Sequence, residues 1–273
     1  MNVSGMRAAM DGYLTALRRS LRLRRTILRL PETLFGTVRV VDTTTGVGRP
    51  IRILEVDGSW QSATYMDEGW ADLVFPYHQL YDVALRHLCP RHVLMLGGGG
   101  YAYPKHLLMT LPDVRVDVAE ADPAIVEVAR RYFLLDRLDE ACGGRDAGGR
   151  LRTLAADAHD VLELGSPDNP TVHWDLILND VFAAEEPLRT LTTPDAAALI
   201  RGRLGPSGAY LANVIGALEG PRACALRKVM RNLETAFAHV WVIPCSPDSP
   251  TCEDNNVVVA TDASWVPEGA YHW

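Results

Sequence analysis

Four consecutive glycines at positions 97–100 constrain the fold of this chain more than any other feature of its sequence. A short apolar segment, His92–Leu96, precedes them and predicts a buried strand, and Pro104 follows them where a helix is expected to begin. A second apolar segment at 114–119 is followed by Glu120. A strand, a glycine turn, a helix and a strand that ends in a carboxylate are typical of a nucleotide site at the edge of a parallel sheet. The glycines let the backbone approach the ligand, and the carboxylate accepts the ribose hydroxyls.

The composition is that of a soluble globular protein. Its 273 residues fit one large domain, or one domain with an appendage, and 48% hydrophobic residues are enough for a sizeable core. The net charge of −7 argues against nucleic acid as the main partner, because a phosphate-binding surface needs an excess of basic residues. No apolar run approaches the ~20 residues that span a bilayer, and the first residues lack the apolar core of a secretory signal. We therefore expect a cytoplasmic protein with no membrane partner.

The cysteines favour a reducing compartment. They are five in number and scattered, which is typical of free thiols. Cys245 and Cys252 bracket a loop of serine, proline and aspartate, and the sequence leaves open whether they pair. Cys89 and His92 have the spacing of two metal ligands, but no second pair of ligands follows nearby, so we expect no metal site.

The N-terminal quarter changes character along its length. Residues 6–30 predict an amphipathic helix with leucines on one face and arginines over much of the rest. This indicates a docking or dimer-contact helix or, alternatively, a helix at a membrane surface. Residues 36–42, 49–57 and 59–66 are short β-branched runs separated by turn residues, and they predict a small antiparallel sheet. The predicted division is an N-terminal helix at 1–32, a β subdomain at 33–70 and a larger α/β domain at 71–273.

Strands and helices alternate through the rest of the chain, which predicts a parallel sheet with helices on both faces. We find no internal repeat and no low-complexity segment. The predicted helices lie at 71–87, after the glycine turn, and at 123–135, 193–204 and 222–237, and the predicted strands at 92–96, 114–119, 152–156, 174–178, 209–215, 239–243 and 256–260.

Four acidic residues follow predicted strands: Glu120, Asp122, Asp157 and Asp180. Because the carboxyl ends of parallel strands meet at one edge of a sheet, we expect these side chains to converge on one crevice. Asp122 directly precedes a proline and is interpreted as a helix cap, which leaves the other three as candidate ligand contacts. Three basic residues near the crevice are interpreted as solvated residues at helix starts: Lys105, His106 and His159.

Two kinds of nucleotide fit the glycine turn. A dinucleotide fingerprint runs through Gly97, Gly99 and Ala102, with Glu120 at about the right distance, but it leaves the later strand-end acids unexplained. An adenosine ligand across three strand ends accounts for more of the sequence. It places Glu120 on the ribose, Asp157 on the adenine amino group and Asp180 at the reacting end.

Seven segments carry a family resemblance. They read DGSWQSATYMDE, FPYHQLYDVAL, LMLGGGGYAYPKHLL, VAEADPAIVEVARRYF, AADAHDVL, WDLILNDVFAAEEP and GPSGAYLANVI. In order and spacing the chain resembles the spermidine synthase (polyamine aminopropyltransferase) family, from about residue 36 to residue 262. The resemblance implies a Rossmann-like fold of the S-adenosylmethionine-dependent methyltransferase type, with residues 71–273 as the catalytic domain. It also implies an adenosyl-sulfonium co-substrate, decarboxylated S-adenosylmethionine in the true synthases, and no tightly bound cofactor.

The resemblance also implies roles for individual residues. It places Glu120 on the ribose of the donor, Asp157 on the adenine, and Asp180 as the catalytic aspartate. An amine must lose a proton before it attacks the carbon next to a sulfonium, and a carboxylate beside it accepts that proton and aligns the nitrogen. The resemblance also assigns Tyr77 to catalysis. Phe182 is assigned to the acceptor or, alternatively, is a core residue. The remaining assignments are Gln61, Gly97, Gly98 and Gly99 to donor binding and His78 and Gln79 to acceptor binding.

The chain departs from the family at three anionic positions. Gly100 stands where the true synthases carry an aspartate that faces the aminopropyl ammonium. Residues 180–183 read DVFA in place of Asp-Ser-Ser-Asp, and Gln79 replaces a glutamate. Burying two ammonium groups without paired charges is costly, so we expect an acceptor other than putrescine. A glycine at position 100 also removes a repulsion against a carboxylate, which makes S-adenosylmethionine itself an alternative donor.

The sequence therefore predicts a transferase that moves an aminopropyl group from decarboxylated S-adenosylmethionine to a small-molecule amine other than putrescine. One alternative is methyl transfer from S-adenosylmethionine, and another is a catalytically inactive binding protein of the same fold. The resemblance and the predicted N-terminal helix also lead us to expect a homodimer.

Overall fold

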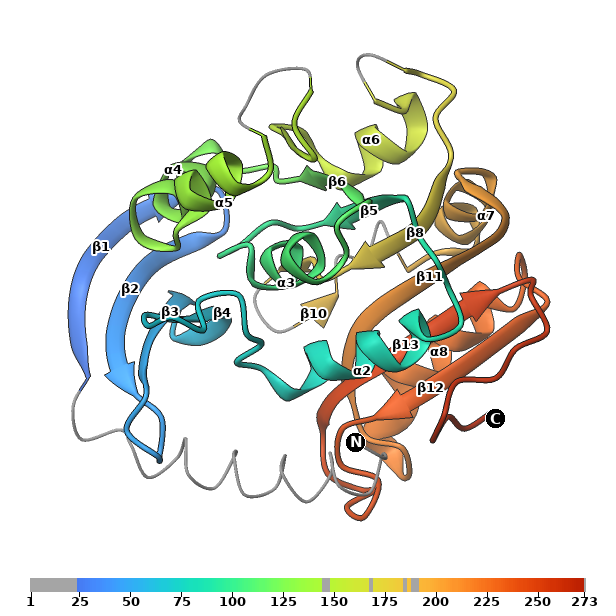
Figure 1. Ribbon diagram of the computed structural model, residues 1–273. Coiled ribbons are helices and arrows are strands. Elements are labelled where there is room, and N and C mark those ends of the chain that lie inside the picture. The colour runs from blue at the N-terminus through green and yellow to red at the C-terminus, as the bar shows by residue number, and fades with distance from the viewer. Residues whose placement is uncertain (1–23, 144–147, 167–168, 184–185, 188–191, 273) are drawn as a thin grey trace.

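The computed structural model describes residues 24–143, 148–166, 169–183, 186–187 and 192–272. Two sheets organise it, a four-stranded antiparallel sheet from the N-terminal part and a seven-stranded sheet flanked by helices (Figure 1). This arrangement confirms the predicted α/β fold with a small N-terminal β subdomain. The exact boundaries of the three predicted parts stay a prediction.

The four-stranded sheet is a simple meander. Its strands β1 (Arg25–Thr33), β2 (Gly36–Thr44), β3 (Pro50–Val56) and β4 (Ser59–Tyr65) pair in chain order, each antiparallel to the next. Asp57 and Gly58 join β3 to β4 with φ of 49° and 91°, the left-handed pair that a two-residue hairpin turn requires. Strands β2, β3 and β4 confirm the three strands predicted from β-branched runs.

Strand β1 corrects the predicted N-terminal helix. Residues 25–33 pair with β2, whereas the predicted helix extends to residue 30. Leu28 and Leu30 pack partly buried against the core, and Pro31 is tolerated because β1 is an edge strand. Pairing with β2 outweighs the helical spacing of the leucines, since it satisfies backbone groups along the strand. Residues 6–23 of the predicted helix lie outside the described residues. The two interpretations of that helix, as a dimer contact or as a membrane-surface helix, therefore stay predictions.

The seven-stranded sheet has the order β12-β13-β11-β8-β5-β6-β7. Neighbours from β11 to β7 are parallel, but β13 is antiparallel to both β11 and β12, so the predicted parallel sheet is wrong at this strand. The connection from β12 to β13 is too short for the crossover that a parallel neighbour needs. The strands are β5 (His92–Leu96), β6 (Arg115–Ala119), β7 (Leu151–Leu154), β8 (Trp174–Asn179), β11 (Leu204–Gly216), β12 (His239–Pro244) and β13 (Asp254–Thr261).

Alternate residues of the strands face two cores. Val93 and Met95 of β5 pack with the four-stranded sheet and helices α2 to α5, whereas Leu94 and Leu96 pack with α6 to α8. The four-stranded sheet therefore shares one continuous core with the larger sheet. The helices are α2 (Pro76–Leu85), α3 (Ala102–Thr110), α4 (Pro123–Tyr132), α5 (Leu135–Ala141), α6 (Ala158–Leu164), α7 (Pro194–Gly202), η3 (Pro221–Ala223) and α8 (Cys224–Leu233), with two short strands, β9 (Phe182–Ala183) and β10 (Glu186–Pro187).

The strand order reverses beside β5. Strand β6, the next in the chain, lies on one side of β5, and β8 lies on the other. Ligands of open α/β sheets bind outside the carboxyl ends of the strands at such a switch point. The glycine turn after β5, Glu120 after β6 and Asp180 after β8 all lie at this edge.

Two further expectations concern membranes and disulfides. In the part of the chain that the structure describes, no helix has both the length and the apolar character to cross a bilayer. All five cysteines lie within that part and each is a free thiol, so Cys245 and Cys252 do not pair.

Candidate active site

The glycine turn joins β5 to α3 and lies against the end of β8. Gly97 and Gly99 have φ of 88° and 48°, a left-handed conformation that favours glycine. A Cβ atom at Gly97 would lie 2.9 Å from the backbone oxygen of Asp180, so the close approach of the two strand ends also requires glycine there.

Glu120 is buried at the end of β6 and binds the glycine turn. Its Oε2 accepts hydrogen bonds from the N–H groups of Gly98 at 3.0 Å and Gly99 at 3.1 Å, and its Oε1 accepts one from Asp122 at 3.0 Å. Burial raises the pKa of Glu120 above its usual value, although these N–H groups act to lower it. The carboxylate occupies two amides of the turn that a pyrophosphate would use, which argues against the dinucleotide interpretation.

Asp122 and Asp157 both cap helices, but they face different surroundings. Asp122 accepts a hydrogen bond from Ala124 at 2.8 Å at the start of α4, as predicted, and a second from the N–H of Leu34 at 2.8 Å. Asp157 accepts one from His159 at 2.7 Å at the start of α6 and is exposed. Asp157 lines the pocket described below, whereas Asp122 ties the β1–β2 hairpin to the large sheet.

Asp180 is held by donors from three directions. Its Oδ2 accepts a hydrogen bond from the Tyr77 hydroxyl at 2.8 Å and lies 3.4 Å from Nε2 of His78. Its Oδ1 accepts a hydrogen bond from the Asn213 amide at 3.0 Å. Burial, and then the neighbouring Asp180 carboxylate, raises the pKa of Tyr77 well above its usual value, so Tyr77 remains a neutral donor.

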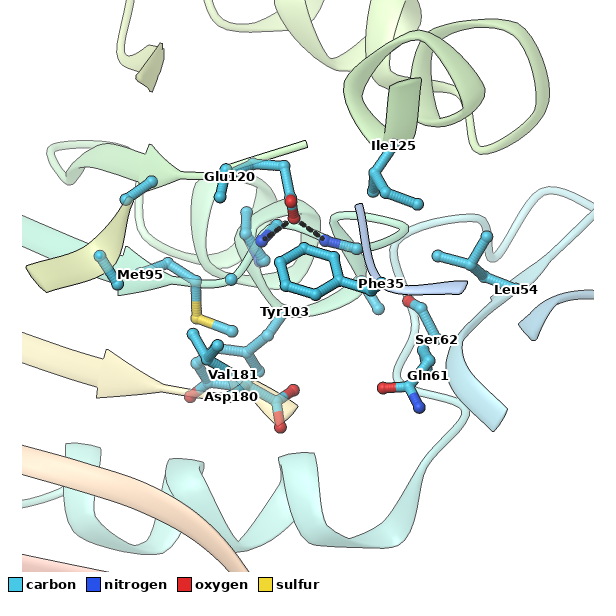
Figure 2. Close-up of a pocket in the computed structure, with 18 of the residues that line it drawn as sticks. Phe35, Leu54, Gln61, Ser62, Met95, Tyr103, Glu120, Ile125, Asp180 and Val181 are labelled. Atoms are coloured by element: carbon cyan, nitrogen blue, oxygen red, sulfur yellow. Dashed lines mark hydrogen bonds between the residues drawn. The ribbon is translucent and has the colours of Figure 1, made fainter. Parts of the chain in front are cut away.

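One pocket brings most of the predicted residues together (Figure 2). It contains about 930 Å³ of empty space, part of which is open to solvent. Glu120 and Asp180 lie on opposite sides of it in the view of Figure 2, and Gln61 and Ser62 lie to one side. The predicted residues that line it are Gln61, His78, Gly97, Gly98, Gly99, Glu120, Asp157 and Asp180.

Two predicted residues with described side chains, Tyr77 and Gln79, do not line this pocket. Tyr77 is buried behind Asp180 and reaches the site only through its hydrogen bond to that carboxylate. Gln79 is half-buried on α2 and lies outside the lining. The side chain of Phe182 lies outside the described part of the chain, so both interpretations of Phe182 stay predictions.

The pocket also has walls that the sequence interpretation missed. Phe35 comes from the β1–β2 hairpin, Leu54 and Ser62 from β3 and β4, and Ile125 from α4. None of these positions carries a local sequence signal, because they reach the pocket only through the packing of the small sheet on the large one. Asn213 on β11 was also missed, although its place beside the end of β8 follows from the strand order. The remaining lining residues are Val56, Met95, Ala102, Tyr103, Pro104, Ala119, Ala121, Ala158 and Val181.

Gly100 is not an open position. A Cβ atom there would lie 2.7 Å from Oγ of Ser62 and 3.0 Å from Cδ1 of Phe133, which is fully buried. The space that the side chain of the family's aspartate would need is therefore filled by Ser62 and Phe133.

The basic residues near the crevice divide into two kinds. Lys105, interpreted as a solvated residue, is instead 1% exposed and donates to Oγ1 of Thr64 at 2.5 Å and to the backbone oxygen of Phe133 at 3.0 Å. Its position on the buried face of α3 explains the error, and burial lowers its pKa to about 7. His106 is half-buried and lies 3.1 Å from Asp82.

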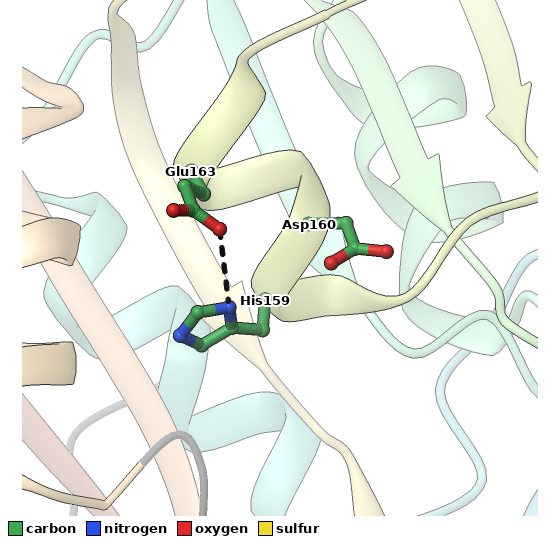
Figure 3. Close-up of side chains that lie close together, drawn as sticks. All are labelled: His159, Asp160 and Glu163. Atoms are coloured by element: carbon green, nitrogen blue, oxygen red, sulfur yellow. Dashed lines mark ion pairs between the residues drawn. The ribbon is translucent and has the colours of Figure 1, made fainter.

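His159 lies on α6 with Asp160 and Glu163 close by (Figure 3). Their potential ligand atoms lie within 4.8 Å of one another, and Nδ1 of His159 is 4.0 Å from the Glu163 carboxylate. Asp160 and Glu163 are exposed, and an ion pair between residues one helical turn apart accounts for the arrangement. We therefore assign this cluster no role.

The fold and the pocket define an α/β protein of the class shared by spermidine synthases and methyltransferases. A probable spermidine synthase from Corynebacterium glutamicum has a TM-score of 0.70 and 18% identity, covering 88% of this chain and 81% of that one. Spermidine synthase in complex with the transition state analogue AdoDATO has a TM-score of 0.62 and 19% identity, covering 88% and 74%. Human methyltransferase-like protein 13 in complex with SAH has a TM-score of 0.51 and 19% identity, covering 70% and 80%. These structures confirm the predicted methyltransferase-type fold.

Sequence relatives confirm the resemblance to spermidine synthases. Polyamine aminopropyltransferase 2 of Hyperthermus butylicus is 28% identical over 191 residues, which cover 68% of this chain and 55% of the relative. Polyamine aminopropyltransferase of a Synechococcus species is 30% identical over 224 residues, which cover 78% and 64%. No family model matches the chain. The chain is thus similar to polyamine aminopropyltransferases, and its match spans less than two thirds of the length of these two curated relatives.

Proposed function

We propose that this chain is a transferase that moves a three-carbon, aminopropyl-type group from an adenosyl-sulfonium donor to a small amine. The observation that carries the proposal is the meeting of Glu120, Asp157 and Asp180, from the ends of three different strands, in one pocket beside the glycine turn. The names of the aminopropyltransferase relatives support the same chemistry.

In the proposed complex, the nucleoside lies along the ends of β6 and β7. In the buried Glu120, Oε2 accepts both glycine amides and Oε1 accepts only the N–H of Asp122, so Oε1 is the oxygen that accepts hydrogen bonds from the ribose hydroxyls. Asp157 accepts a hydrogen bond from the adenine amino group. Apolar side chains of Ile125 and Ala158 flank this end of the pocket and exclude water from the base.

The acceptor amine binds at Asp180 in this proposal. Tyr77 and Asn213 fix the two carboxylate oxygens, so Asp180 presents its remaining lone pairs in a set direction. Asp180 accepts a proton from the acceptor ammonium and aligns the nitrogen with the carbon next to the sulfonium. We assign Asp180 the catalytic role and Tyr77 a positioning role, with His78 in contact with the acceptor.

We also propose an acceptor other than putrescine. Among the described lining residues, Asp180 is the one carboxylate at the reacting end, and Gln79 lies outside the pocket. A diamine brings a second ammonium, whose burial without a paired charge is costly. Turnover compared between putrescine and a monoamine such as butylamine tests this point, and faster turnover of putrescine would contradict it.

A second candidate function is methyl transfer. The observation that favours it is Gly100, where no carboxylate is present to bind a decarboxylated donor. Mass spectrometry of the spent donor separates the two reactions. Release of 5′-methylthioadenosine supports transfer of the three-carbon chain, and release of S-adenosylhomocysteine supports methyl transfer. A protein that binds neither donor form would instead be the inactive binding protein of this fold. The homodimer and the cytoplasmic location stay predictions.

A further inference from the structure

One wall of the pocket is left over when the proposed donor is in place. With the nucleoside on Glu120 and Asp157 and the reacting carbon beside Asp180, the tail beyond that carbon faces β4 and the start of α3. Gln61 and Ser62 of β4 and residues 102–104 of α3 are among the residues that line the pocket, and Figure 2 labels Gln61, Ser62 and Tyr103. The following inference rests on the proposed function, because that function sets the orientation of the donor.

An irregularity in β4 turns two neighbouring polar residues toward the pocket. Ser62 pairs with Leu54 and Trp60 pairs with Glu55, so Gln61 is an extra residue in the strand. Such a bulge changes the direction of side chains and is common beside active sites. Gln61 and Ser62 therefore both line the pocket, although adjacent residues of a regular strand face opposite ways.

Ser62 is the buried member of this pair. It is 4% exposed, and its hydroxyl makes no hydrogen bond to any residue that the structure describes. Its Oγ atom is not fully enclosed by protein atoms, so the hydroxyl opens onto the pocket. Because Ser62 lines the pocket, its missing partner is best supplied by a polar group of the ligand.

Among the residues that the structure describes, the same wall contains no acidic side chain. The acidic residues of the described lining are Glu120, Asp157 and Asp180, at the nucleoside and reacting ends. At Gly100 a Cβ atom would lie 2.7 Å from the Ser62 hydroxyl, so a side chain there would require Ser62 to move. An ammonium at the end of a decarboxylated tail would have no charged partner on this wall.

The start of α3 adds a preference for negative charge. Helix α3 spans nine residues and begins after Tyr101, whose φ is 55°. No side chain caps this end, and the first turn contains no acidic residue. Uncapped N–H groups and the helix dipole stabilise an anion at a helix N-terminus. The wall thus combines a buried hydroxyl donor, an amide side chain and a helix start, which suit a carboxylate.

We infer that this wall binds the α-carboxylate of S-adenosylmethionine and that Ser62 determines the choice of donor. The reaction is then transfer of a 3-amino-3-carboxypropyl group. The amine lone pair attacks the γ-carbon and forms the N–C bond. The electron pair of the C–S bond passes to sulfur, which leaves as the neutral thioether of 5′-methylthioadenosine. The proton that Asp180 took from the acceptor ammonium before the attack passes to solvent, and the product leaves as a protonated secondary amine.

Isothermal titration calorimetry with S-adenosylmethionine and with its decarboxylated form tests the inference on the full chain. We expect S-adenosylmethionine to bind at least as tightly as the decarboxylated donor. Tighter binding of the decarboxylated donor would overturn the inference and leave the proposed function in place. If neither donor binds, the proposed function itself fails.

Two variants at Ser62 test its role. In Ser62→Asp we expect the affinity for S-adenosylmethionine to fall by about tenfold or more relative to that for the decarboxylated donor, because the new carboxylate repels the donor's own. Ser62→Ala, which changes least in the fold, should weaken S-adenosylmethionine severalfold and leave the decarboxylated donor unchanged. Ser59→Asp adds the same charge to β4 outside the pocket and should leave the ratio of affinities unchanged. An unchanged ratio in both Ser62 variants would overturn the role of Ser62.

Discussion

Asp180 is half-buried, and each of its two carboxylate oxygens accepts a hydrogen bond from a neighbouring side chain. Tyr77 and Asn213 donate to its two oxygens, and its side chain is 12% exposed. A carboxylate held in this way loses little freedom when the acceptor binds, which favours proton transfer in a fixed geometry. Its value as a base therefore depends on neighbours that come from α2 and β11 as well as on the residue itself.

Replacing Asp180 with asparagine removes the proton acceptor and keeps the shape. We expect Asp180→Asn to lower the turnover rate by about 10²–10⁴-fold, the usual contribution of a general base. Donor affinity measured by calorimetry should stay within a few-fold. Asp175→Asn, at the other end of β8, is the matched control and should keep full turnover. Equal turnover of Asp180→Asn and the unaltered chain would contradict the assignment.

Glu120 binds the glycine turn, and in the proposed complex it also binds the ribose. Because burial raises its pKa, we expect donor affinity to fall on acidification at pH values above the usual 4.5 of a glutamate. The charged carboxylate is the form that accepts the ribose hydroxyls, so Glu120→Gln should bind the donor more weakly and without this pH dependence. Calorimetric titrations from pH 5 to pH 8 measure both effects, and identical profiles for the two proteins would argue against ribose binding by Glu120.

Lys105 makes stability depend on pH. Burial lowers its pKa to about 7, from 10.5 for a free lysine. Between these values the unfolded chain binds a proton that the folded chain does not, so the free energy of unfolding rises with pH over this window and is flat below it. Lys105→Met should remove this contribution. Chemical denaturation at pH 7 and pH 9 measures it, with the exposed Lys228→Met as the control. If the free energy of unfolding depends on pH in the same way in Lys105→Met and in the unaltered chain, the lowered pKa of Lys105 is contradicted.

At the scale of elements, the sequence predicts those whose signal is local. Strand β5 has the predicted bounds, and Asp57-Gly58 forms the predicted hairpin turn. The helix predicted at 123–135 ends at Tyr132, and Leu134, in a left-handed conformation with φ of 63°, separates it from the unpredicted helix α5. The helix predicted at 71–87 begins only at Pro76, where proline suits a first turn. Helix α6 was missed because seven residues give too little periodicity to recognise.

Asp122 joins two elements, since it caps α4 and holds the β1–β2 hairpin through Leu34. Asp122→Ala should lower the free energy of unfolding by about 1–2 kcal/mol. It should also weaken donor binding, because Phe35 on the same hairpin lines the pocket. Thr193→Ala removes the cap of α7 alone and is the matched control for the cap. If both variants bind the donor equally well, the hairpin does not contribute to the site.

At the scale of the whole molecule, the site is made where two sheets meet. The large sheet supplies the residues that sequence order alone predicts, because strand ends meet at one edge of a parallel sheet. The small sheet supplies Phe35, Leu54 and Ser62, whose place depends on long-range packing that no local pattern encodes. The same packing buries Lys105 and fills the space beside Gly100. The part of the pocket formed by strand ends was thus predictable from sequence, and the part formed by the small sheet was not.

The central claim is that carboxylates from three strand ends form one site for an adenosyl-sulfonium donor. A crystal structure of the full chain with bound 5′-methylthioadenosine tests it most directly, because this nucleoside is the part of the donor shared by every reaction considered. The account predicts that the ribose hydroxyls contact Glu120, that the adenine amino group contacts Asp157, and that the sulfur lies on the side of Asp180. A nucleoside bound elsewhere, or one in this pocket with its base at Asp180, would contradict it.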